Sequence, residues 1–202
     1  MQIATTYPIM ETFTSVQGEG AFTGVPSFFI RLGGCDVGCV WCDVKESWDA
    51  EKHPRQSVSE LVDRAVASGV NHVIITGGEP TLYDLTDLTL SLKQAGLRVH
   101  LETSGTNPLT GEFDWITFSP KKFKEPLAEY FQHSHELKVV VYHKSDLDWA
   151  LDLAAKMPES TSLYIQAEWE KREQVTPLIF QHVIKNPRWR VGVQIHKYMG
   201  VE

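Results

Sequence analysis

The stretch Ser27-Phe-Phe-Ile-Arg-Leu-Gly-Gly-Cys-Asp-Val-Gly-Cys-Val-Trp-Cys42 joins a short β-rich run to a loop that carries all three cysteines of this 202-residue chain. Three residues separate the first cysteine from the second, and two separate the second from the third. An odd and tightly spaced set of thiols cannot form a disulfide framework. We therefore expect a reducing compartment and a metal centre.

The spacing of Cys35, Cys39 and Cys42 lets one iron–sulfur cube contact all three thiols. Ferredoxin-type clusters use four cysteines, and this chain has no fourth. One iron would then be open to a ligand that is not protein, which is typical of a reactive metal site. A zinc site completed by a histidine such as His53 is the alternative that the cysteines alone leave open.

The rest of the chain alternates between β-rich runs and amphipathic helical stretches, which is a βα pattern. The pattern predicts strands at 27–32, 72–76, 98–103, 115–118, 137–141, 162–166 and 190–194. It predicts helices at 58–67, 84–94, 127–133, 146–155 and 173–184, and a loop at 43–56.

The length and this alternation together predict the fold. A complete eight-unit barrel needs about 250 residues, so residues 1–202 are expected to form a single domain of about six βα units, an open, partial TIM barrel. Ligands of parallel α/β folds bind beyond the carboxyl ends of the strands. Polar motifs stand at several predicted strand ends, namely Thr76-Gly-Gly-Glu-Pro80, Glu102, Ser119-Pro-Lys121, Gln166 and Gln194-Ile-His-Lys197.

Charge and hydropathy exclude several functional classes. The net charge of −7 argues against a nucleic-acid partner, because such proteins usually carry a basic face. No apolar stretch approaches the ~20 residues that span a bilayer, and the first residues lack the layout of a signal peptide. We expect a cytoplasmic protein without a membrane partner.

The cysteine spacing resembles that of the radical S-adenosylmethionine (SAM) superfamily. The resemblance implies a radical SAM core in which SAM binds the open iron of a 4Fe–4S cluster and its cleavage supplies a radical to the substrate. Gly77-Gly-Glu-Pro80 resembles the motif that binds the SAM amino group, with glycines for close approach and Glu79 as an acceptor. The SAM-binding positions that this implies are Trp41, Cys42, Asp43, Gly78, Glu79, Glu102, Ser119, Pro120, Lys121, Gln166, Ala167, Glu168 and Trp169.

The two ends of the chain resemble the 7-carboxy-7-deazaguanine synthase family, through Glu11-Thr-Phe-Thr-Ser-Val-Gln-Gly-Glu-Gly20 and Gln194-Ile-His-Lys-Tyr198. The resemblance implies a carbon–nitrogen lyase that converts 6-carboxy-5,6,7,8-tetrahydropterin to 7-carboxy-7-deazaguanine with loss of ammonia, toward the tRNA nucleoside queuosine. The substrate carboxylate suits an arginine fork. The implied substrate positions are Val16, Gln17, Gly18, Glu19, Arg31, Thr76, His196 and Glu202.

One position departs from the family pattern. The family commonly has Cys-Asp-Thr where this chain has Cys42-Asp-Val44, and the threonine hydroxyl binds magnesium. Valine has no side-chain oxygen, so the sequence puts Mg²⁺ dependence in doubt.

The same resemblance implies a homodimer and an electron donor such as flavodoxin or ferredoxin. An activase that makes a glycyl radical on a partner protein is the alternative enzyme, since it shares the cysteine spacing. It would not explain Gln17-Gly-Glu-Gly20 or the ending from Gln194.

Overall fold

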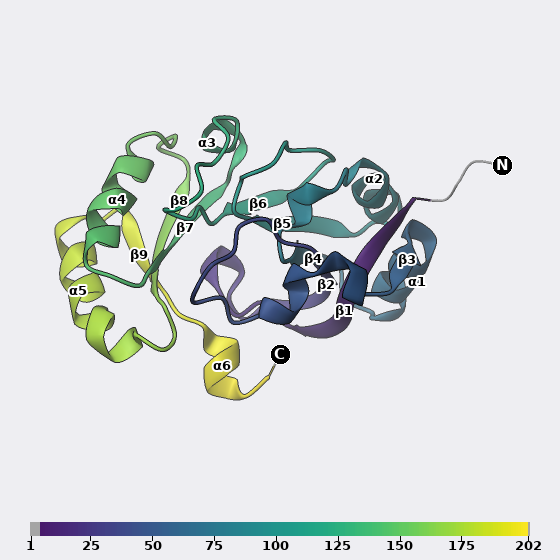
Figure 1. Cartoon of the computed structure of the whole chain (residues 1–202), viewed down its shortest axis with the longest axis horizontal. Helices are drawn as coiled ribbons and strands as arrows, with labels where there is room; N and C mark the ends of the chain where they lie inside the picture. Colours follow the sequence, from purple (N-terminus) through teal and green to yellow (C-terminus); the bar gives the residue numbers. More distant parts are fainter. Residues whose placement is uncertain (1–4, 202) are drawn as a thin grey trace.

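The computed structural model describes residues 5–201, and one nine-stranded sheet runs through them in the order β3-β1-β2-β4-β5-β6-β7-β8-β9 (Figure 1). The strands are β1 (Thr6–Val16), β2 (Pro26–Leu32), β3 (Arg55–Ser57), β4 (His72–Gly77), β5 (Arg98–Thr103), β6 (Trp115–Phe118), β7 (Glu136–Val141), β8 (Ser162–Ala167) and β9 (Trp189–Gly192). Each neighbouring pair from β2 to β9 is parallel, whereas β1 is antiparallel to both β2 and β3. Because β3 and β9 are the two edges, the barrel is open, as the sequence predicted.

Helices cover the outer side of the curved sheet, except α6 (Ile195–Met199), which lies at its open side (Figure 1). The others are α1 (Val58–Ala67), α2 (Thr86–Gln94), α3 (Tyr130–His133), α4 (Ser145–Ala154) and α5 (Arg172–Lys185). One apolar cluster packs α1 and α2 on the strands from β1 to β6, and a second packs α4 and α5 on β7 and β8. No helix within residues 5–201 is long and apolar enough to cross a membrane.

Local sequence explains these elements. Val73, Ile74 and Ile75 of β4 are completely buried, which is expected of a parallel strand covered on both faces. The start of α1 is a capping box, in which Glu60 N donates to Ser57 Oγ at 3.3 Å and Ser57 N donates to Glu60 Oε2 at 2.7 Å.

Several predictions about elements were wrong. The predicted strand at 27–32 is confirmed as β2, but β1, which precedes it, was not predicted. The predicted loop at 43–56 contains the start of β3 and two short 3₁₀ turns, at Lys45–Trp48 and Ala50–Lys52. The last predicted strand ends at Gly192, and α6 was not predicted. β1 and α6 were missed because neither has a clear apolar period. Much of β1 is only partly buried, and no residue of α6 is buried.

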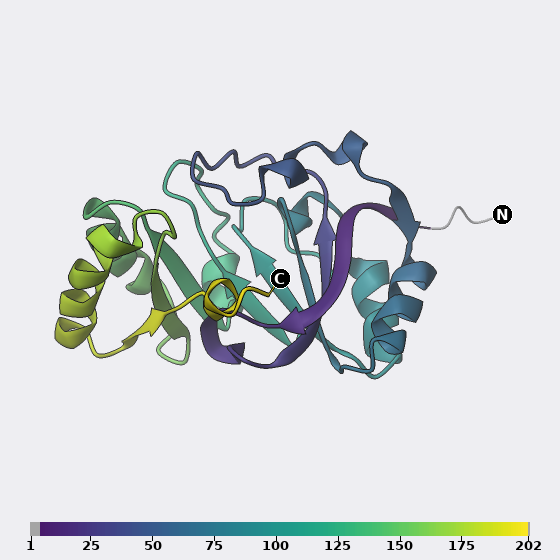
Figure 2. The same ribbon diagram turned by 90° about the horizontal axis from the view of Figure 1, so that it is seen from below.

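The parallel strands end at one rim of the sheet, where the loop after β2 lies across their tips (Figure 2). That loop carries the three cysteines. The fold thus gathers the strand-end motifs around the cysteines, as expected for a parallel α/β protein.

Candidate active site

The cysteine loop and the turn after β4 form one packed unit. β2 and β4 pair in parallel, with Leu32 opposite Gly77. Gly78 N donates to Leu32 O at 3.0 Å, and Glu79 N donates to Gly34 O at 2.8 Å. A Cβ on Gly78 would lie 2.3 Å from Gly34 O, so only glycine fits without a shift of the cysteine loop.

Cys35, Cys39 and Cys42 line one cavity of about 230 Å³. All three are free thiols. Burial raises the pKa of the Cys39 thiol to about 11, and the nearby Lys121 ammonium opposes that rise. Cysteines bind metals as thiolates, so a cation beside Cys39 favours the ligating form.

Within residues 5–201, the three thiols are not grouped with a fourth ligand for a zinc ion. Tetrahedral zinc brings its ligands within about 4 Å of one another. Within the described part of the chain, no three His, Cys, Asp or Glu side chains are grouped so as to hold one metal ion. His53 is the fourth ligand that a zinc site would use, and its Nε2 lies 2.9 Å from Glu46 O.

The residues expected near the SAM nucleoside gather at this cavity. Trp41 lines it together with Ser119 and Lys121 from the turn after β6. Lys121 Nζ lies 5.9 Å from the centre of the Trp41 ring and donates to Ser119 Oγ at 2.9 Å. Burial lowers the pKa of Lys121, and Cys39 opposes that shift. Pro120 is buried and does not line the cavity.

Glu79 lines the cavity, yet its carboxylate is occupied by the protein's own donors. The residue is 1% exposed. It accepts from Thr81 N at 3.1 Å, Thr81 Oγ1 at 2.7 Å and Thr103 Oγ1 at 2.6 Å. It also accepts from Ser104 N at 2.8 Å and from Ser104 Oγ. These five bonds use the lone pairs that the sequence assigned to the SAM amino group, and they anchor the turn to β5.

The end of β8 and α6 close another side of the cavity. Four consecutive residues line it here: Gln166, Ala167, Glu168 and Trp169. The Trp169 ring meets Tyr198 of α6 edge-on, with the ring centres 5.1 Å apart. Lys197 Nζ lies 5.3 Å from the centre of the Trp169 ring and 2.7 Å from Asp43 Oδ2. The C-terminal helix therefore connects β8 to the cysteine loop.

A second cavity, of about 360 Å³, adjoins the first and holds most of the expected substrate residues. Those that line it are Gln17, Glu19, Arg31, Thr76 and His196. Val16 does not line it, and Glu202 lies outside the described residues. Glu19, Arg31 and Thr76 line both cavities, as do Glu102 and Val44. The two cavities are therefore parts of one cleft.

Gly18 belongs to the wall of the cleft rather than to its lining. Ile195 N donates to Gly18 O at 3.0 Å, and a Cβ on Gly18 would lie 1.8 Å from His196 Nδ1. Burial lowers the pKa of His196. Arg31 pairs through its Nε with Glu11 Oε1 at 2.6 Å.

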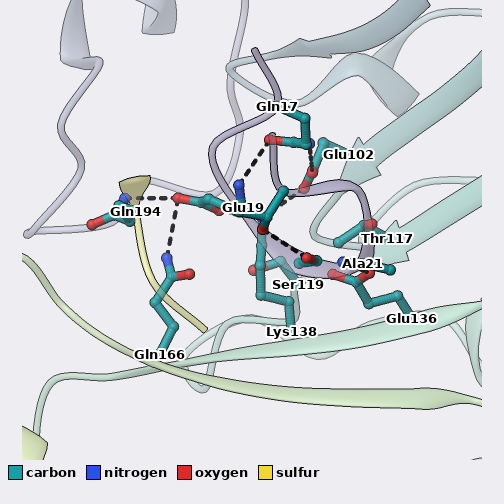
Figure 3. A network of polar contacts seen from close by, with 12 residues as sticks. Gln17, Glu19, Ala21, Glu102, Thr117, Ser119, Glu136, Lys138, Gln166 and Gln194 are labelled. Carbon is teal, nitrogen blue, oxygen red and sulfur yellow. Dashed lines mark hydrogen bonds and ion pairs between the residues drawn. The ribbon is translucent and has the colours of Figure 1, made fainter. Parts of the chain in front are cut away.

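A buried ion cluster forms the floor that the two cavities share (Figure 3). Lys138 Nζ lies 2.5 Å from Glu19 Oε2 and 2.8 Å from Glu102 Oε2. Burial alone would raise the pKa of Glu19, but Lys138 lowers it to about 2. Burial raises the pKa of Glu102, with Lys138 opposing. Burial alone would lower the pKa of Lys138, but the two carboxylates raise it well above its usual range.

Three polar side chains complete the cluster. Glu19 Oε1 accepts from Gln166 Nε2 at 3.1 Å and from Gln194 Nε2 at 2.7 Å, and Gln17 Nε2 donates to Glu102 Oε1 at 3.0 Å (Figure 3). Lys138 was not among the residues predicted from the sequence. The sequence feature that could have pointed to it is a lysine that interrupts the otherwise apolar run 137–141.

Comparison with known proteins agrees with this geometry. Residues 29–140 match the family model described as the radical SAM superfamily. A 7-carboxy-7-deazaguanine synthase from Synechocystis sp. is 53% identical over 98% of this chain and 95% of the relative. The chain belongs to the 7-carboxy-7-deazaguanine synthase family. The enzyme of that name from Escherichia coli K12 is 33% identical over 96% of this chain and 99% of the relative.

A solved structure of the 7-carboxy-7-deazaguanine synthase family shows the same fold. The crystal structure of QueE from Escherichia coli superposes with a TM-score of 0.84 at 33% identity and covers 94% of each chain. As a radical SAM protein of this family, the chain uses a 4Fe–4S cluster and SAM, which the three thiols of the cavity fit. The comparisons support neither the glycyl-radical activase nor the zinc module.

We predict that Gly78→Ala lowers cluster content. The added methyl group would lie 2.3 Å from Gly34 O and 2.7 Å from Cys35 Cβ, so the cysteine loop must move. Iron and sulfide analysis of the anaerobically reconstituted protein would measure the loss. Gly96→Ala is the control, because its left-handed φ of +79° makes it the more strained alanine while its Cβ position has open space around it. Equal cluster content in Gly78→Ala and the control would contradict the prediction.

Proposed function

We propose that the protein converts 6-carboxy-5,6,7,8-tetrahydropterin to 7-carboxy-7-deazaguanine with loss of ammonia, as a carbon–nitrogen lyase on the route to queuosine. One observation carries the proposal: the cavity of the cysteines and the polar cavity of Arg31 share their lining and form one cleft. Such a cleft can hold SAM beside a small polar substrate. The relatives that carry the synthase name cover nearly the whole chain.

Cys35, Cys39 and Cys42 would hold the cluster, and the residues around them would hold SAM. When bound, the cluster and SAM supply a radical that abstracts hydrogen from the substrate. Gly78 lines the cavity beside the cysteines, where the methionine part of SAM would lie, and Trp41 offers an aromatic face for the adenine.

The second cavity supplies fixed donors and acceptors for a fused polar ring. The Nε of Arg31 is held by Glu11 at 2.6 Å, so its Nη groups are the donors for the substrate carboxylate. Gln17, Thr76 and His196 offer further donors and acceptors around the same space. Buried polar groups of this kind give a site its selectivity, because a wrong ligand leaves them unpaired.

The proposal includes the setting in which the enzyme works. We infer a cytoplasmic, single-domain protein that receives its electrons from a flavodoxin or ferredoxin and forms a homodimer. Exposed Phe180 and Ile184 of α5 and Val191 on the open edge strand β9 support self-association, because an exposed apolar sheet edge favours a partner.

The direct test of the function is anaerobic turnover. Cluster-loaded protein with SAM, a reductant and 6-carboxy-5,6,7,8-tetrahydropterin should form 7-carboxy-7-deazaguanine, detected by chromatography and mass spectrometry. Cys39→Ala is the control, which should form none because the cluster loses a ligand. If 5′-deoxyadenosine forms without the deazapurine, the cleft acts on another substrate and the proposal fails.

We predict that Arg31→Ala abolishes measurable turnover, because the substrate carboxylate loses its charged partner. Losing a charge-assisted pair in a desolvated site corresponds to about a hundredfold or more in kcat/KM. Iron content should stay at the wild-type level. Arg64→Ala is the matched control, since Arg64 bonds Thr12 on the surface at 3.3 Å and lies outside the cleft. Unchanged activity of Arg31→Ala would sink the assignment of this residue.

We predict weak or absent stimulation by Mg²⁺, because the residues do not fit that ion. Val44 lines both cavities without a side-chain oxygen, and its carbonyl accepts from Ser47 N at 3.1 Å and Ser47 Oγ at 2.7 Å. Asp43 is paired with Lys197. Turnover of chelator-treated enzyme should therefore change little when Mg²⁺ is added, whereas Val44→Thr should gain stimulation. A strict requirement in the wild type would refute this.

A further inference from the structure

Lys138 is a buried cation in the middle of the cleft. It lies on β7, is 6% exposed and lines both cavities. A buried lysine is rare, because removing an ammonium from water costs several kcal/mol unless partners compensate. The compensation comes from Glu19 and Glu102, whose carboxylate oxygens lie 2.5 and 2.8 Å from Nζ (Figure 3).

The two carboxylates come from different parts of the fold. Glu19 follows β1 and is tied to the C-terminal part of the chain by Gln194 at 2.7 Å. Glu102 lies near the end of β5 and is tied back to the N-terminal segment by Gln17 at 3.0 Å. Lys138 thus joins β5, β7 and the segment after β1 at one point.

Stability alone does not explain this arrangement. A buried ion cluster can usually be replaced by apolar side chains of similar volume with no loss of stability. Two carboxylates beside one ammonium also leave an excess negative charge in the cleft, which suits the sulfonium cation of SAM. The ion cluster lies where ligands bind, since all three members line both cavities.

We propose that Lys138 is a positioning residue that holds Glu102 and Glu19 in place where the SAM side and the substrate side of the cleft meet. The affinity for each ligand therefore depends on Lys138, although neither ligand needs to contact it. The substrate half of this inference rests on the proposed function.

Binding to the cluster-loaded protein without reductant tests the proposal, because no turnover is needed. In Lys138→Met, the dissociation constants of SAM and of 6-carboxy-5,6,7,8-tetrahydropterin, measured by equilibrium dialysis, should both rise about tenfold or more. Lys93→Met is the matched control. Lys93 pairs with Asp114 at 2.9 Å away from the cleft, and its loss should leave both constants unchanged. Constants within about twofold of wild type in Lys138→Met would overturn the proposal.

A second variant tests whether Lys138 positions Glu102 or only neutralises the charge of Glu19. It also covers the case in which Lys138→Met alone misfolds. Glu19→Gln combined with Lys138→Met removes one negative and one positive charge, so the net charge of the buried ion cluster is unchanged. Only one carboxylate, that of Glu102, is then left without the ammonium. Compared with Glu19→Gln alone, the double variant should bind SAM about tenfold more weakly, because Glu102 has lost its anchor. Equal SAM affinity in the two variants would show that Lys138 only neutralises Glu19, and the proposal would fall.

The two proposals fail in different ways. A wild-type protein that binds SAM but not the carboxypterin would contradict the proposed function. The SAM measurements on Lys138→Met and on the double variant would still decide whether Lys138 positions Glu102.

Discussion

The parallel pairing of β2 with β4 is the constraint on which the site depends. It sets Leu32 opposite Gly77, so the loop after one strand and the turn after the other start side by side. Two consecutive glycines then let the backbones touch, since a Cβ on Gly77 would lie 2.4 Å from Leu32 O and one on Gly78 would lie 2.3 Å from Gly34 O. Backbone contact therefore sets where the cysteine loop starts.

The buried ions complete the other half of the cleft. Glu19 reaches into the barrel from the segment after β1, and Lys138 and Glu102 meet it from β7 and β5. The amides of Gln17, Gln166 and Gln194 satisfy the remaining carboxylate lone pairs, so the cluster is a connected network rather than an isolated ion pair. Both ends of the chain thereby become part of the site, which is consistent with substrate selection by residues near the termini.

Sequence predicted the parts of the molecule that local patterns encode. The strands at 98–103 and 115–118 and the helix at 58–67 agree with the structure in full, because both strands are short runs rich in apolar or β-branched residues and the helix has a clear apolar period. The strand-end motifs gathered at one cleft because the carboxyl ends of parallel strands share one rim. Which cleft residues contact each ligand remains a prediction.

Other features depend on contacts between distant residues and could not be predicted. β1 forms because β2 and β3 pair with it, not because its own residues follow an apolar alternation. Lys138 gains its place from carboxylates 36 and 119 positions away. Three of the five donors around Glu79 likewise belong to Thr103 and Ser104, which reach it because β4 and β5 are neighbours.

The central claim is that SAM and the pterin lie side by side in one cleft, and an isotope tracer tests it most directly. Substrate deuterated at C6, the carbon expected to lose hydrogen, would be turned over anaerobically, and SAM and 5′-deoxyadenosine would be analysed by mass spectrometry. If the two cavities form one site, deuterium passes from the substrate into these nucleosides. Product formation with nucleosides free of deuterium would contradict the account.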